Sequence, residues 1–68
     1  MSIAMKITIL SHAEIVKAVV DDGGPEITAT YYRRTTDDGP RGWLFLRETI
    51  VRGPLHLALD TVHRVVNA

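Results

Sequence analysis

The sequence predicts a small α+β domain that comprises residues 1–68, and three observations support this class. Stretches rich in Ile, Val, Thr and Tyr alternate with clusters of Gly, Pro and Asp, as expected for strands separated by turns. The C-terminal residues show apolar side chains at helical spacing. The chain has 68 residues, 46% of them hydrophobic and 24% charged, which fits one globular domain. The predicted order is β-α-β-β-α, and its first strand runs from about Ile3 to Leu10 because that stretch is β-branched and nearly alternating.

The stretch between Ser11 and Asp22 is predicted to be a helix. Ser11 and Glu14 have the S-x-x-E spacing of a capping box. The apolar residues that follow fall on one side of a helix: Ile15, Val16, Val19 and Val20. A strand over the same residues would mix charged and apolar side chains on both faces. Because three Val and one Ile favour extended chain, a β-β-β-α meander plus helix is the alternative, with Glu14–Val20 as a strand and Asp21–Gly24 as a hairpin turn.

An antiparallel β-hairpin and an amphipathic helix complete the predicted fold. Strands over Ile27–Thr35 and Trp43–Val51 flank a dense turn signal at Thr36–Gly42. Gly53 and Pro54 mark the start of the last helix, since Pro is tolerated in the first helical turn. Apolar residues recur at helical spacing from there to the C-terminus: Leu55, Ala58, Leu59, Val62, Val65 and Val66.

The predicted hairpin has apolar and aromatic residues on both faces. If Thr35 opposes Trp43, strand parity places aromatic and cationic residues together on one face: Tyr31, Arg33, Trp43, Phe45 and Arg47. The other face then carries a second set: Tyr32, Arg34, Leu44, Leu46 and Ile50. We expect the helices to cover one face, and a second copy of the chain or a partner protein to cover the other. Parity leaves open which face belongs to the core.

These residues lead to two hypotheses about function. The first is a small non-enzymatic protein-binding regulator or inhibitor, antitoxin-like or of the mobile-element or phage type that blocks a host complex. It would act through a hairpin or helix surface, as a homodimer, and would bind through six residues: Tyr31, Arg33, Arg34, Trp43, Phe45 and Arg47. The alternative is single-stranded nucleic-acid binding, with aromatic rings that stack on bases and guanidinium groups that hold phosphate.

The charge distribution bears on the choice between these hypotheses. Residues 31–68 contain six Arg against four acids, whereas residues 1–30 contain two Lys against four acids. This asymmetry gives the nucleic-acid alternative modest support. The formal net charge of the whole chain is zero, which argues against strong nonspecific attraction to nucleic acid or membranes.

Other classes of protein are disfavoured by composition. The chain has no Cys, which excludes disulfides and thiolate metal sites and fits a cytoplasmic location. His56, Asp60 and His63 share one flank of the last helix, but they also form its polar edge and match no H-E-x-x-H motif, so we expect no metal and no cofactor. Lys6 interrupts the first apolar run, so we expect no signal peptide, and no stretch reaches the roughly 20 apolar residues of a membrane span.

Overall fold

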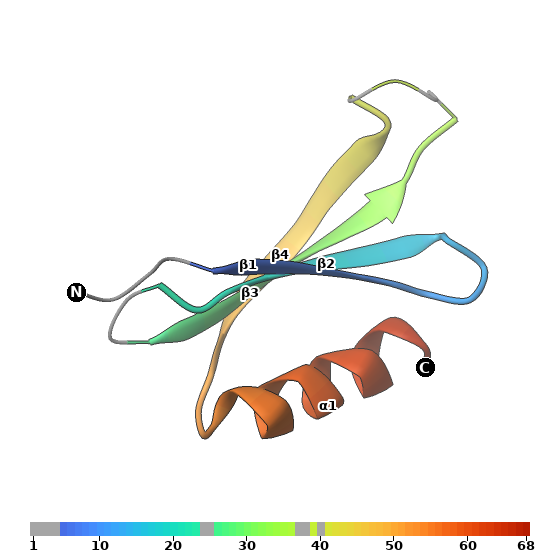
Figure 1. The fold of residues 1–68 in the computed structure, drawn as a ribbon. Helices are drawn as coiled ribbons and strands as arrows, with labels where there is room; N and C mark the ends of the chain where they lie inside the picture. The colour runs from blue at the N-terminus through green and yellow to red at the C-terminus, as the bar shows by residue number, and fades with distance from the viewer. Residues whose placement is uncertain (1–4, 24–25, 37–38, 40) are drawn as a thin grey trace.

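A computed structural model describes residues 5–23, 26–36, 39 and 41–68 of the chain. Four antiparallel strands form one sheet in the order β1-β2-β3-β4: β1 (Lys6–Leu10), β2 (Val16–Asp21), β3 (Ile27–Arg34) and β4 (Trp43–Val51). One helix, α1 (Leu55–Val66), follows the sheet and lies against one of its faces (Figure 1). The predicted α+β class is therefore confirmed, and no described element covers the second face of the sheet.

The helix predicted over residues 11–22 is wrong, because β2 occupies the second half of that stretch. The residues of β2 that face α1 alternate along the strand: Val16, Ala18 and Val20. Lys17 and Asp21 share the opposite face, and Glu14 lies in the turn before β2, so charges do not mix on both faces. The alternative strand over Glu14–Val20 overlaps β2, but both predicted orders, β-α-β-β-α and β-β-β-α, are wrong, because the observed order is β-β-β-β-α.

Ser11 stabilises a hairpin turn instead of capping a helix. Its Oγ accepts hydrogen bonds from the backbone N–H groups of Ile15, at 3.0 Å, and Val16, at 3.3 Å. The Ser11 N–H donates to the carbonyl of Val16 at 3.0 Å, which closes the turn between β1 and β2. Glu14 adopts a φ of 54° in this turn. A serine hydroxyl satisfies nearby N–H groups in turns as well as at helix starts, so the S-x-x-E spacing does not distinguish the two.

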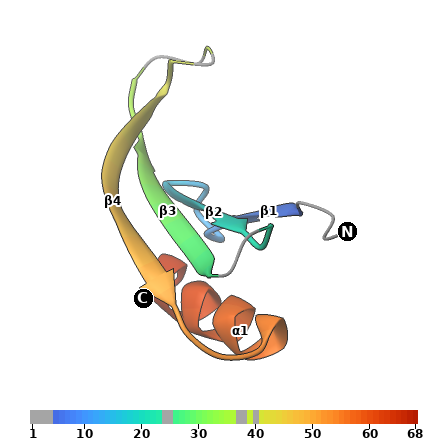
Figure 2. The same ribbon diagram turned by 90° about the vertical axis from the view of Figure 1, so that its left-hand side faces the viewer.

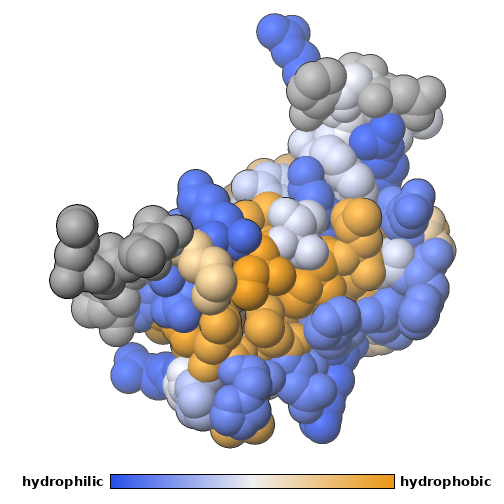
Figure 3. Space-filling view, viewed as in Figure 1, coloured by the Kyte–Doolittle hydropathy of each residue, from blue (hydrophilic) through white to orange (hydrophobic). Residues whose placement is uncertain are grey.

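The hydrophobic core lies between α1 and one face of the sheet. The sheet contributes small and β-branched residues and one aromatic ring: Ile9, Ala18, Val20, Ala29 and Tyr31. Val62 and Val66 of α1 pack on them, and apolar residues form a continuous area where the helix meets the sheet (Figure 3). The Oδ1 atom of Asn67 accepts a hydrogen bond from the N–H of His12 at 3.1 Å, which ties the end of the helix to the β1–β2 turn.

The predicted hairpin and C-terminal helix are confirmed, but the hairpin register changes along its length. The predicted register holds from Ile27 to Tyr31, where Tyr31 pairs with Arg47. Leu46 is then an extra residue in β4, and beyond this bulge Trp43 pairs with Arg34, one residue away from the predicted partner. The turn signal at residues 36–42 includes residues 37, 38 and 40, which lie outside the described part of the chain.

Replacing Glu14 with Gly should raise the free energy of unfolding by up to about 1 kcal/mol, because Gly adopts a positive φ without the steric cost of an L side chain. Urea unfolding followed by Trp43 fluorescence measures this change. Glu48→Gly, in the middle of β4, is the matched control and should lower the stability. If residue 14 lay in a helix, Glu14→Gly would lower the free energy of unfolding by about 1 kcal/mol. A clear decrease therefore contradicts the turn between β1 and β2.

Candidate functional site

The bulge at Leu46 divides the six predicted interaction residues between the two faces of the sheet. Three of them lie on the open face: Arg34, Trp43 and Phe45. The other three lie on the face that packs against α1: Tyr31, Arg33 and Arg47. The prediction that Tyr31, Arg33, Trp43, Phe45 and Arg47 share one face is therefore wrong, because one extra residue in a strand inverts the parity of every residue beyond it.

Five residues form a cation–aromatic cluster on the open face: Lys17, Tyr32, Arg34, Trp43 and Phe45. The Lys17 Nζ lies 4.5 Å from the centre of the Trp43 ring and 5.0 Å from that of Tyr32. The Arg34 Cζ lies 5.2 Å from the centre of the Trp43 ring. The rings of Tyr32 and Phe45 meet edge to face, with centres 6.2 Å apart. Three strands thus hold two cations against aromatic rings.

Sequence reasoning missed Lys17 and Tyr32 as members of this cluster. Lys17 comes from the strand that had been assigned to a helix, and it pairs directly with Tyr32 of β3. Tyr32 in turn pairs with Phe45 of β4, which had been placed on the opposite face. The alternation of Val16, Ala18 and Val20 was the available signal, since it places Lys17 on the sheet face away from the core.

Strand β4 exposes apolar side chains and lies at one edge of the sheet (Figure 2). The exposed fractions are 59% for Leu44, 57% for Phe45, 43% for Leu46 and 52% for Ile50. The outer side of β4 pairs with no strand of the described chain, so its backbone can accept another strand. This apolar strand adjoins the cation–aromatic cluster, and Trp43 and Phe45 belong to both.

Tyr31 belongs to the core, and the exposed Arg47 side chain lies against its ring on the same face of the sheet. Tyr31 is only 4% exposed, and the Arg47 Cζ lies 5.1 Å from the centre of its ring. Arg33 is exposed and lines a groove of about 370 Å³ at the end of α1. The Asn67 amide in this groove already bonds to His12 and to the carbonyl of His63. These hydrogen bonds join the end of α1 to the β1–β2 turn, and the groove lies where the two meet.

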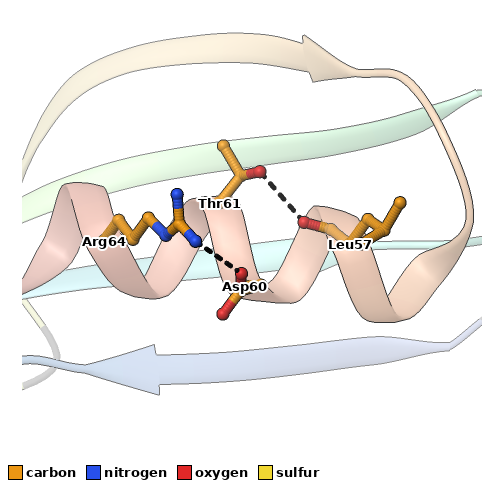
Figure 4. A network of polar contacts seen from close by, with 4 residues as sticks. All are labelled: Leu57, Asp60, Thr61 and Arg64. Atoms are coloured by element: carbon orange, nitrogen blue, oxygen red, sulfur yellow. Dashed lines mark hydrogen bonds and ion pairs between the residues drawn. The ribbon is translucent and has the colours of Figure 1, made fainter.

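The polar flank of α1 is organised by contacts within the helix (Figure 4). The Arg64 Nη2 donates to Asp60 Oδ2 at 3.2 Å, and the Thr61 hydroxyl donates to the carbonyl of Leu57 at 2.9 Å. Asp60 therefore pairs with a cation one turn along the helix, on the polar flank that also carries His56 and His63. Within residues 5–23, 26–36, 39 and 41–68, no group of three His, Asp or Glu side chains is arranged to hold a metal ion.

Two further observations bear on the class of protein. In the described part of the chain, no helix combines the length and apolar character needed to cross a membrane. Comparison of the chain with protein-family models, with curated proteins and with solved structures gives no match. The residues of the open face and of β4 are therefore the features of the molecule that bear on its function.

A double-mutant cycle of Lys17→Gln and Trp43→Leu should give a coupling free energy of about 0.5–1 kcal/mol, the range of exposed cation–π contacts. Urea unfolding followed by circular dichroism measures it, because that signal survives the loss of Trp43. The control is Lys6→Gln, since Lys6 shares the open face but pairs with Asp21 at the far end of the sheet. Zero coupling between Lys17→Gln and Trp43→Leu contradicts the cluster, and so does an equal coupling between Lys6→Gln and Trp43→Leu.

Proposed function

We propose that the chain is a small non-enzymatic regulator or inhibitor that binds another protein through the open face of the β3–β4 hairpin. The single observation that carries this proposal is the position of exposed Phe45 against Tyr32, a ring that Lys17 also contacts, on a sheet face that no described element covers. Exposed apolar groups rimmed by charge are typical of protein-interaction sites, and Trp, Tyr and Arg are enriched in them.

The chemistry of the cluster indicates the kind of surface that it would bind. Lys17 and Arg34 are held over aromatic rings, so they lose less side-chain freedom on binding than free cations would. Their positive charge suits carboxylates on a partner, and Phe45 offers an apolar contact between them and the sheet edge. We infer an acidic and partly apolar protein surface as the partner.

Single-stranded nucleic acid is the second candidate, and one observation favours it: two cations lie beside Trp43 and could hold phosphate. Three other observations favour protein. Tyr31 is buried, so its ring cannot stack on a base. The ring of Trp43 already contacts Lys17 and Arg34, which leaves Phe45 as the ring with most surface for a base. Asp21 and Glu48 also lie on the open face, where they would repel phosphate.

Phe45→Ser should abolish capture of a partner protein by the immobilised chain from a nuclease-treated cell lysate. Leu57→Ser is the matched control, because Leu57 is 52% exposed on α1 and lies away from the cluster, and this variant should capture the same protein. Both variants should keep the circular dichroism spectrum of the parent chain, since both side chains are more than half exposed.

Two outcomes count against this proposal. Equal capture by the parent chain and the Phe45→Ser variant would show that the open face does not bind the protein. Quenching of Trp43 fluorescence by a single-stranded oligonucleotide at low salt, with affinity that falls as salt rises, would replace the proposal with the nucleic-acid alternative.

A further inference from the structure

We propose that two copies of the chain associate by antiparallel pairing of their β4 strands, so that one sheet continues across both copies. This inference goes beyond the proposed function, because it names a second copy of the chain as a partner and is argued from the edges of the sheet alone. The dimer forms through the backbone at the outer edge of β4, whereas the partner protein proposed above contacts the open face, and Trp43 and Phe45 adjoin both contacts.

The two edges of the sheet differ in how they are protected against pairing. Strand β1 has five residues and begins with Lys6, and short edge strands that carry Lys resist pairing with other chains. Strand β4 has nine residues, contains neither Pro nor Lys, and exposes apolar side chains on both of its faces. Of the two edges, β4 is therefore the one open to strand addition.

The bulge at Leu46 limits where two β4 strands can pair regularly. Antiparallel pairing of identical strands has a two-fold axis, and the residue on that axis meets its own copy. Arg47 or Glu48 on the axis would place like charges opposite each other, which is destabilising. The part of β4 before the bulge is residues 43–45, which carry no charge, and Leu44 is its middle residue. An axis at Leu44 therefore pairs all three residues regularly.

An axis at Leu44 also matches side chains across the new strand pair. Leu44 faces its own copy on one face of the sheet, and Trp43 faces the second copy's Phe45 on the other face. Such aromatic pairs stabilise antiparallel strands. The contact is smaller than the about 800 Å² per partner of a standard interface, so the dimer should dissociate on dilution.

The test is a disulfide scan, which is clean because the chain has no Cys. Leu44→Cys places two thiols on the axis, where facing Cα atoms lie about 4.5–5.5 Å apart and a disulfide can form. Glu48→Cys is the control on the same strand, since four residues from the axis its two copies would lie roughly 26 Å apart. Leu57→Cys on α1 is the control for random collision.

Under mild oxidation at high micromolar concentration, the Leu44→Cys variant should form the covalent dimer at least about tenfold faster than either control, and urea should abolish this difference. Equal rates for all three variants, or fastest reaction of Glu48→Cys, would overturn the proposal. Light scattering on the unmodified chain is the second measurement: a mass that rises with concentration supports the dimer, and a strict monomer at high micromolar concentration contradicts it.

The two proposals fail in distinguishable ways. A chain that stays monomeric but loses a partner protein on Phe45→Ser refutes the β4 dimer and leaves the proposed function standing. A chain that crosslinks at position 44 but shows no partner that depends on Phe45 retains the dimer and refutes the binding of another protein.

Discussion

One helix of 12 residues covers only one face of a four-stranded sheet, and the rest of the molecule depends on this constraint. The covered face takes the small and β-branched side chains, and Val20 of the sheet and Val62 of the helix are fully buried there. The opposite face carries Lys17, Tyr32 and Trp43, whose contacts with one another replace part of the missing cover. Exposed apolar side chains on β4 are typical of contact surfaces, and a domain of this size has little further apolar surface with which to cover them.

The bulge in β4 determines which side chains share the open face. Without the extra residue Leu46, Trp43 and Phe45 would lie on the side of Tyr31 and α1. With it, Trp43 joins Arg34 and Lys17, and Tyr31 keeps its place in the core under Arg47. Bulges commonly re-aim side chains near functional sites, and here the bulge produces the cation–aromatic cluster.

Much of the fold could be predicted from the sequence, and the failures have physical causes. The bounds of β4 and the helical spacing after Pro54 follow directly from local pattern, because turn residues bracket both elements. The region of β2 is ambiguous, since its Val and Ile residues fit one side of a helix but divide between the two faces of a strand, and only pairing with β1 and β3 decides.

The candidate site was less predictable than the fold. Arg34, Trp43 and Phe45 are among the predicted interaction residues and lie on the open face, but the sequence does not predict their neighbours, because a single-residue bulge leaves no reliable mark in sequence. Lys17 could not be placed beside Trp43 until the second strand was known, since the contact joins residues 26 positions apart. Sites of this kind depend on strand register, which is a tertiary property.

Amide hydrogen exchange, followed by nuclear magnetic resonance over a range of protein concentrations, tests the central claim most directly. The claim is that β4 is the edge through which the sheet makes contacts, whereas β1 is protected by its length and by Lys6. We expect the amides in residues 43–46 to become more protected as concentration rises, while those of β1 do not change. Protection that rises in β1 instead, or that is independent of concentration in both edge strands, would contradict it.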